Sequence, residues 1–218
     1  MQILRLEKPA LAVLNKIGLR YGYPYLRCVS FRAETLFNII KSNLNSGDNF
    51  LDIMCGYSPL AGPLLKSGYH ITGFDNNRKV IRDVRKMYPS GKWICASYKN
   101  LKLQSATDYP FSVFLLLGAS EVCCQRSFIS SLDKLLNVNK PRMFFLETNK
   151  SIEKAPTIAS PFVEELATMR SVYLSGYNAV LKFLIDHSYE VTAVGQYDAQ
   201  FNEKWATDRI YVILRAKN

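Results

Sequence analysis

The stretch from Asn49 to Asn77 constrains the fold more than any other part of this chain. It reads NFLDIMCGYSPLAGPLLKSGYHITGFDNN, and it contains two apolar runs separated by a turn and a short helical segment. The first run has no internal Gly or Pro, which is typical of a strand covered on both faces; its apolar members are Phe50, Leu51, Ile53 and Met54. The stretch therefore predicts a strand, a helix and a second, parallel strand, which is the repeating unit of α/β proteins.

Two acids and one glycine suggest that this unit binds a nucleoside. Asp52 ends the first strand, Gly56 lies in the turn, and Asp75 ends the second strand. Gly56 has no Cβ, so its backbone can take a positive φ or let a ligand approach closely. A carboxylate at position 75 would stand at the carboxyl edge of a parallel sheet, where it can accept both hydroxyl hydrogens of a ribose. A purely structural alternative remains, because Asp75 or Asn76 would also serve as the N-cap of the next helix.

The residues after Gly56 argue against a dinucleotide. A pyrophosphate needs the pattern G-x-G-x-x-G, whose second glycine lets the backbone approach the phosphates. This chain instead continues with Tyr57, Ser58, Pro59, Leu60 and Ala61. A bulky tyrosine and a proline without an N–H make a poor pyrophosphate cradle.

These residues resemble the first motif of the class I S-adenosylmethionine-dependent methyltransferases. That motif consists of an acid, a turn of the form G-C-G-x-G, and a second-strand acid that holds the ribose; Asp52, Cys55, Gly56 and Asp75 match it. Met54 stands where the family usually has its first glycine, and Ser58 where it has its third. The resemblance implies S-adenosylmethionine as the cofactor. The cofactor-binding residues it implies are Asp52, Cys55, Gly56, Tyr57, Asp75, Asn76, Ser97, Tyr98, Leu117 and Gly118.

The rest of the chain continues the alternation of helices and strands. Helices are predicted at Arg78–Tyr88, Arg126–Val138 and Ser171–His187, and strands at Lys92–Ala96, Phe111–Leu117, Met143–Glu147, Tyr189–Val194 and Arg209–Leu214. This order implies an α/β fold: a three-layer sandwich with a mostly parallel seven-stranded sheet that ends in an antiparallel hairpin.

Length and composition favour one domain over residues 1–218. We expect residues 1–48 to form an N-terminal helical cap and residues 149–170, a long connection, to be an insertion on the substrate side. The first twenty residues mix charged and apolar side chains, unlike a signal peptide, and no apolar run is long enough to span a membrane. The sequence therefore predicts a cytoplasmic protein without a transmembrane segment, and it indicates no oligomeric state.

The positive charge of the chain is concentrated in its N-terminal half. The formal net charge is +10, and residues 1–110 hold 16 Lys and Arg against 7 Asp and Glu, which accounts for +9. The mixture of Tyr21, Tyr23, Arg27 and Arg32 predicts an acceptor-binding segment, because such mixtures bind phosphates and stack on bases. Two alternatives remain: a solvated cap whose aromatic residues pack over the cofactor pocket, and a basic segment that lies on an anionic membrane.

The candidate catalytic residues are two glutamates. Glu121 follows the fourth predicted strand and Glu147 ends the fifth, so either could accept a proton from a methyl acceptor or orient it. Glu121 would equally satisfy free N–H groups at a helix N-terminus. The five cysteines have no C-x-x-C spacing, so we expect neither a disulfide framework nor a metal site, and neither histidine lies near a candidate nucleophile in sequence.

The sequence favours a methyltransferase that acts on an O or N atom of a small or medium-sized metabolite. An RNA methyltransferase is the first alternative, because Cys55, Gly56, Pro59 and Ala61 also resemble the C-G-x-x-P-x-A turn of the aminoglycoside-resistance methyltransferases of ribosomal RNA. The Asn/Asp-Pro-Pro-Tyr/Phe motif of amino-methylating enzymes is missing after the fourth strand, where Leu117 is followed by Gly-Ala-Ser. Because two motif glycines are replaced, a catalytically silent binding protein is the second alternative.

Overall fold

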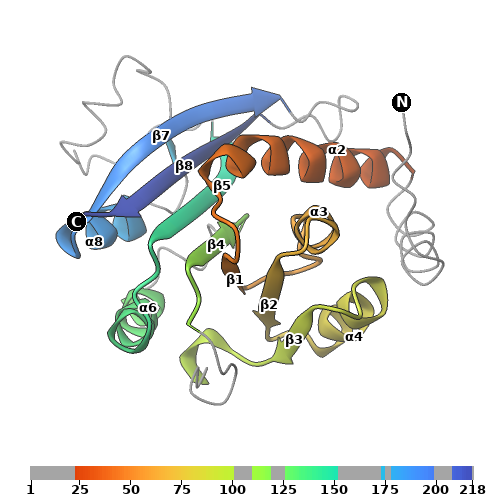
Figure 1. Cartoon of the computed structure of the whole chain (residues 1–218), viewed down its shortest axis with the longest axis horizontal. Coiled ribbons are helices and arrows are strands. Elements are labelled where there is room, and N and C mark those ends of the chain that lie inside the picture. The colour runs from red at the N-terminus through yellow and green to blue at the C-terminus, as the bar shows by residue number, and fades with distance from the viewer. Residues whose placement is uncertain are drawn as a thin grey trace. The chain divides into compact units, whose positions relative to one another are not determined.

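The computed structural model describes residues 23–100, 110–118, 126–151, 173–174, 178–198 and 208–217. These residues divide into two compact units. The first consists of residues 23–100, and the second contains the remaining described ranges. Figure 1 traces both along the chain.

The first unit is built on three parallel strands in the order β3-β2-β1. Asp52 pairs with Gly73 across β1 and β2, and Asp75 pairs with Cys95 across β2 and β3, so the carboxyl ends of the three strands meet at one edge. Its elements are α2 (Tyr23–Ile40), η1 (Lys41–Asn43), β1 (Asn49–Ile53), α3 (Ala61–Lys66), β2 (His70–Asp75), α4 (Arg78–Met87), β3 (Lys92–Cys95) and η2 (Tyr98–Asn100).

Helix α4 shows why the local sequence folds as it does. Its apolar side chains recur at helical spacing, and Ile81, Val84 and Met87 are buried. The side chain of Asn77 caps the helix by accepting hydrogen bonds from the backbone N–H groups of Lys79 and Val80, at 3.1 and 3.3 Å. The predicted helix and its start are therefore confirmed, and Asn77 provides the cap that Asp75 or Asn76 was considered for.

A large indole packs onto β2 at a glycine. A Cβ added to Gly73 would lie 2.5 Å from the ring of Trp93, so no larger residue fits there without movement. Trp93 is buried on β3, and its Nε1–H donates to the backbone oxygen of Tyr88 at 2.7 Å. Gly73 therefore lets β3 pack closely against the strand that carries Asp75.

The second unit combines a parallel pair of strands with an antiparallel hairpin. β4 runs parallel to β5, β8 runs antiparallel to β5, and β7 runs antiparallel to β8. Its elements are β4 (Val113–Leu117), α6 (Arg126–Val138), β5 (Met143–Ser151), β6 (Tyr173–Leu174), α8 (Asn178–Asp186), β7 (Tyr189–Asp198) and β8 (Asp208–Ala216). The predicted α/β fold class, with seven mostly parallel strands that end in an antiparallel hairpin, is confirmed.

Three predicted boundaries in this unit are wrong, one of which is the end of β7, since this strand continues past the predicted Val194 to Asp198. The helix predicted at 171–187 is Asn178–Asp186 in the structure, and Tyr173–Leu174 form the short strand β6, paired with Lys150 and Ser151 of β5. Tyrosine has a strand preference, and pairing with β5 decides its conformation over local helical periodicity. β5 itself continues beyond Glu147 to Ser151.

The predicted cap and insertion fall only partly within the described residues. Residues 23–43 of the cap are helical, and residues 1–22 lie outside the described ranges. Residues 149–151 of the expected insertion belong to β5, and residues 152–170 lie outside the described ranges. Within the described residues, every helix is too short or too polar to cross a lipid bilayer.

We predict that Gly73→Ala lowers the free energy of unfolding by about 1–3 kcal/mol, because the new methyl group would overpack the indole of Trp93. Urea denaturation measures this loss. In a Trp93→Leu background the same substitution should cost much less, since the ring that it meets is gone. Equal costs in the two backgrounds would contradict the proposed contact.

Candidate functional site

The turn after β1 has alternating left-handed residues. Met54, Gly56 and Ser58 have φ angles of 55°, 50° and 48°. These are the three positions at which the class I motif has glycines, so the backbone keeps the conformation although two glycines are replaced. A non-glycine residue in this region costs roughly 1–2 kcal/mol, which the surrounding structure must offset.

Hydrogen bonds join this turn to the end of β2. The backbone N–H of Cys55 donates to the oxygen of Phe74 at 2.9 Å, and that of Gly56 donates to Asp75 Oδ2 at 3.1 Å. Asp75 Oδ1 accepts from the N–H of Asn77 at 2.8 Å. A carboxylate offers about four acceptor sites, so these two bonds leave Asp75 the capacity to accept ribose hydroxyls.

The turn presents bare backbone to open space. A Cβ added to Gly56 would meet no atom of the described residues within 4 Å. The thiol of Cys55 is turned inward, and burial raises its pKa well above the ordinary value, so it stays protonated. A ligand can therefore approach the backbone at Gly56 without meeting a reactive thiol.

Beneath the turn lies a buried carboxyl group. Asp52 is 1% exposed, and Ser58 Oγ donates to its Oδ2 at 2.5 Å. Its Oδ1 is buried without a hydrogen-bond partner among the described residues. Burial raises the pKa of Asp52 to about 7, while the Ser58 hydrogen bond and the Arg32 charge lower it and the Asp75 charge raises it. Asp52 therefore changes its protonation near neutral pH.

The residues after β3 lie at the same edge as Asp75. The N–H of Ala96 donates to the backbone oxygen of Asp75 at 3.0 Å, and the exposed Cys95 thiol lies 3.9 Å from the oxygen of Asn76. Ser97 Oγ accepts from the N–H of Lys99 at 3.3 Å, and Lys99 Nζ lies 5.9 Å from the Tyr98 ring centroid. The first unit thus brings Asp52, Cys55, Gly56, Asp75 and Asn76 together, with Ser97 and Tyr98 following β3 and Tyr57 half-buried in the turn.

In the second unit, Leu117 and Gly118 end β4. Leu117 is buried, and Gly118 has a φ of 78°. The N–H of Gly118 donates to the backbone oxygen of Glu147 at 2.7 Å, which holds the end of β4 against β5.

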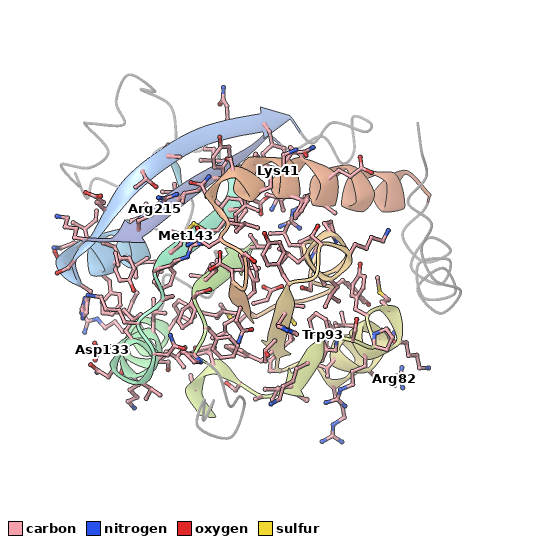
Figure 2. All side chains as sticks on the ribbon, viewed as in Figure 1. Lys41, Arg82, Trp93, Asp133, Met143 and Arg215 are labelled. Atoms are coloured by element: carbon pink, nitrogen blue, oxygen red, sulfur yellow. The ribbon has the colours of Figure 1, made fainter. Side chains whose placement is uncertain are left out.

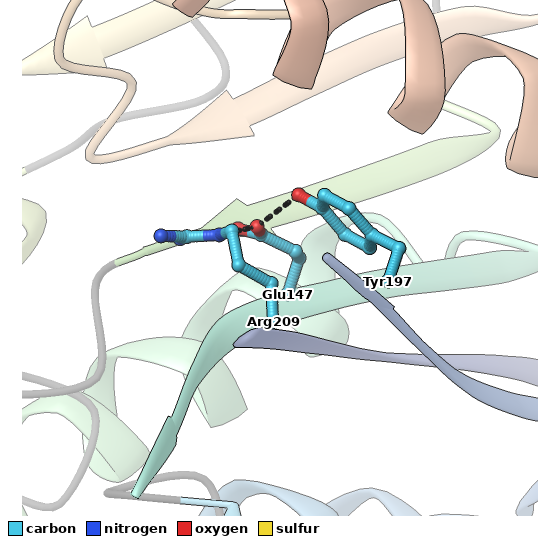
Figure 3. Close-up of polar contacts among 3 residues, drawn as sticks. All are labelled: Glu147, Tyr197 and Arg209. Carbon is cyan, nitrogen blue, oxygen red and sulfur yellow. Dashed lines mark hydrogen bonds and ion pairs between the residues drawn. The ribbon is translucent and has the colours of Figure 1, made fainter. Parts of the chain in front are cut away.

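The side chain of Glu147 forms a buried cluster with Tyr197 and Arg209, shown in Figure 3. Arg209 Nε and the Tyr197 hydroxyl both donate to Oε1, the latter at 2.6 Å, and Arg209 Nη2 donates to Oε2 at 2.9 Å. Glu147 is fully buried and Arg209 is 8% exposed. Glu147 is shielded from solvent and its charge is paired with Arg209, so this geometry supports a structural role, and the catalytic role of Glu147 stays a prediction.

Several predicted residues lie partly or wholly outside the description. Glu121 and Tyr21 are outside the described ranges. Tyr23 and Arg27 belong to α2, although the placement of their side chains is outside the description. Arg32, predicted to bind the acceptor, is half-buried on α2, and its charge acts on Asp52.

Sequence reasoning missed the role of Ser58. It noted Ser58 only as a replaced glycine, whereas the structure makes it the hydrogen-bond donor to Asp52. A hydroxyl six residues after a strand-ending acid was the signal available. No group of three or more His, Cys, Asp or Glu side chains in the described ranges is arranged to hold a metal ion.

The chain is similar to known proteins in its three-dimensional structure but not in its sequence. No protein-family model matches the chain, and no curated protein matches it in sequence. The fold is similar to magnesium protoporphyrin IX methyltransferase from Synechocystis with bound SAH, with a TM-score of 0.59, 13% identity, and coverage of 88% of this chain and 84% of that one. The chain has the class I methyltransferase fold.

Two further structures share this fold. The N-methyltransferase NodS from Bradyrhizobium japonicum superposes with a TM-score of 0.58 at 12% identity, over 86% of this chain and 95% of that one. The plantazolicin methyltransferase BpumL, in complex with SAH and a pentazolic substrate analogue, does so with a TM-score of 0.58 at 16% identity, over 95% and 91% of the two chains.

We predict that Asp52→Asn changes how stability depends on pH. Because the folded-state pKa of about 7 exceeds the ordinary 3.8, protonated Asp52 stabilises the fold below pH 4, and this contribution, about 4 kcal/mol in total, is lost as pH rises through 7. Asparagine does not titrate, so the free energy of unfolding of the variant relative to the wild type should increase between pH 5 and 8. Urea denaturation at several pH values measures it. The exposed Asp186→Asn is the control, and parallel curves for Asp52→Asn and the wild type would contradict the prediction.

We predict that Glu147→Gln lowers the free energy of unfolding by about 3–5 kcal/mol, because the buried guanidinium group of Arg209 loses the negative charge of the carboxylate it is paired with. Tyr197→Phe removes one hydrogen bond to a charged group and should cost less, about 1.5 kcal/mol. Replacing both Glu147 and Arg209 with Met should recover much of the loss in urea denaturation. A double variant that is no more stable than Glu147→Gln would show that the ion pair does not explain the cost.

Proposed function

We propose that this chain is an S-adenosylmethionine-dependent methyltransferase in which Asp75 holds the ribose of the cofactor beside the turn at Gly56. One observation carries the proposal: the carboxylate that ends β2 also fixes a turn of three left-handed residues, with open space next to its glycine. A purely structural N-cap does not require this, since Asn77 already caps α4.

The described residues of the first unit fit an adenosyl group. Asp75 would accept hydrogen bonds from the ribose hydroxyls. Asn76, Ser97 and Tyr98 would border the adenine, and the half-exposed ring of Tyr98 provides a surface on which a base can stack. Ser97 Oγ already accepts one hydrogen bond and has a second lone pair for the adenine amine.

The bound cofactor would supply a methyl group that its sulfonium already activates for transfer. The protein then has to position the acceptor atom and exclude water, which makes a strong base unnecessary when the acceptor is a good nucleophile. This agrees with a Glu147 whose oxygens are both hydrogen-bonded, and with a Cys55 thiol that stays protonated.

For the acceptor we propose an O or N atom of a small or medium-sized metabolite. Support comes from two structural neighbours, the magnesium protoporphyrin IX methyltransferase and the plantazolicin methyltransferase, whose names refer to a porphyrin and to plantazolicin. Tyr21, Tyr23, Arg27 and Arg32 remain proposed acceptor-binding residues, and Glu121 remains a proposed catalytic residue. Cys95 is a free, exposed thiol, which supports a reducing compartment such as the cytoplasm.

RNA is the second candidate acceptor, and the positive charge of the first unit favours it. A catalytically silent protein is the third reading. Methyl transfer distinguishes the readings: labelled S-adenosylmethionine should label a small-molecule fraction or an RNA fraction of a cell extract. Binding of the cofactor without transfer to either fraction would support the silent reading.

We predict that Asp75 binds the ribose hydroxyls of S-adenosylhomocysteine, which calorimetry can test. For the wild type, the 2′-deoxy analogue should bind about 10- to 100-fold more weakly, since a hydrogen bond to a charged group contributes about 1.5–3 kcal/mol. Asp75→Ala should lose at least tenfold in affinity for S-adenosylhomocysteine and should no longer distinguish it from the analogue.

The control for this experiment is Asp83→Ala on α4, which removes a carboxylate away from the turn and should keep the discrimination. Thermal melting establishes that each variant is folded, because Asp75 also bonds the backbone of Gly56 and Asn77. If the wild type bound S-adenosylhomocysteine and its 2′-deoxy analogue equally well, this would contradict the proposal that Asp75 binds the ribose.

A further inference from the structure

Helix α4 carries an unusual concentration of positive charge. Its sequence, RKVIRDVRKM, contains five basic residues and one acid in ten positions. All five basic residues are exposed: Arg78, Lys79, Arg82, Arg85 and Lys86. The single acid, Asp83, lies 3.6 Å from Arg82, whose side chain is 64% exposed.

The helix dipole favours the two basic residues of the last turn, Arg85 and Lys86, but it does not explain those at the start of the helix. Its first turn holds Arg78 and Lys79 and no acid, although the positive end of the helix dipole disfavours cations there by about 0.3–1 kcal/mol each. Arg78 and Arg82, and Arg82 and Lys86, are like-charged pairs four residues apart, which cost about 0.2–0.5 kcal/mol each. A bound polyanion would relieve this repulsion.

The charges form a row along the outer side of the helix. Residues 78, 82 and 86 follow one another at intervals of four, or about 6 Å each along the helix axis, so the row extends over about 12 Å. The row lies on the side opposite the buried Ile81 and Val84, and Figure 2 labels Arg82 on it. It is therefore too long for one phosphate group and matches a chain of phosphates.

Arg85 continues the positive surface toward β3. Its Nε and Nη2 both donate to the backbone oxygen of Trp93, at 3.2 and 2.6 Å, which fixes the guanidinium group. Lys92, next to Trp93 in the chain, is exposed. The basic surface thus spans two elements of the first unit.

We propose that the α4 basic face, formed by Arg78, Lys79, Arg82, Arg85 and Lys86, binds the phosphates of RNA. A membrane surface fits less well, because interfacial helices place large apolar side chains beside their cations. Among the described residues, the exposed large hydrophobic side chain is Val138, which belongs to α6 in the second unit. This inference deepens the second candidate of the proposed function, and RNA binding can be measured without the cofactor.

The test is the binding of a labelled single-stranded RNA of about 20 nucleotides by the whole chain at several salt concentrations. If four phosphates are contacted, log K should fall with log salt with a slope of about −3, since each contact contributes about 0.7 for a single strand. In the variant Arg82→Gln/Lys86→Gln the slope should become shallower by about 1.4, and affinity at 0.1 M salt should fall at least tenfold.

The matched control is Arg126→Gln/Lys134→Gln, which removes two exposed charges from α6. This control should keep the RNA affinity and the salt slope close to those of the wild type. If both variants lost the same affinity, the loss would be an effect of net charge alone, and the proposal would be overturned. The α4 variant removes repulsion, so its melting temperature should be no lower than that of the wild type.

Three other outcomes would also overturn the proposal. They are an RNA affinity weaker than about 100 μM at physiological salt, the upper limit of ordinary non-specific binding, an affinity unchanged by the α4 substitutions, and tighter binding to phosphatidylserine vesicles than to RNA. Calorimetry with S-adenosylhomocysteine on the same variants keeps the two proposals separate. An α4 variant that no longer binds RNA but still binds S-adenosylhomocysteine supports both proposals. A wild type that does not bind S-adenosylhomocysteine counts against the proposed methyltransferase function but not against RNA binding.

Discussion

The hydrogen bond from the N–H of Gly56 to the carboxylate of Asp75 organises the first unit. It spans 19 positions of sequence and fixes the turn after β1 against the last residue of β2. The same aspartate accepts two more hydrogen bonds. Its side chain accepts one from the backbone N–H of Asn77, and its main-chain oxygen accepts one from the backbone N–H of Ala96. One residue therefore sets the position of three strand ends, and an adenosyl ligand would bind where those ends meet.

Two of the three buried carboxylates in the described residues, Asp52 and Glu147, are stabilised in different ways. Glu147 has a buried guanidinium partner and a tyrosine hydroxyl, so its charge is compensated within the second unit. Asp52 accepts a hydrogen bond from a serine hydroxyl and feels the charge of Arg32, but the effect of burial is larger than both and raises its pKa. The first arrangement pairs two opposite charges, whereas the second gives a group whose charge changes near neutral pH.

The spacing of hydrophobic residues and the capping residues predicted the helices and strands that depend on neighbouring residues in the sequence. The strand at Asn49, the helix at Arg78 and the helix Arg126–Val138 follow from hydrophobic spacing and capping, and the structure has them within one or two residues of the prediction. Strand β6 was not predictable in this way, because its two residues are held by pairing with β5. The same applies to the pair of Glu147 and Arg209, which are 62 positions apart.

The turn after β1 shows a subtler limit of prediction from sequence. Sequence patterns count glycines, whereas the fold requires left-handed backbone, which Met54 and Ser58 adopt without being glycine. A departure from the motif in letters is thus not a departure in conformation, and this is one physical reason why structural similarity remains where sequence similarity is lost. Ser58 also supplies a hydroxyl that a glycine would lack, which explains how Asp52 can be buried beneath the turn.

The pairing of β6 with the end of β5 has a consequence for the length of chain between the two strands. Ser151 and Tyr173 are cross-strand neighbours, so the 21 residues between them begin and end at one fixed point of the second unit. Loop-closure entropy grows slowly with length, by about 0.6 kcal/mol for each doubling. A change in the number of residues between these two anchors would therefore cost the pairing of β5 with β6 little free energy.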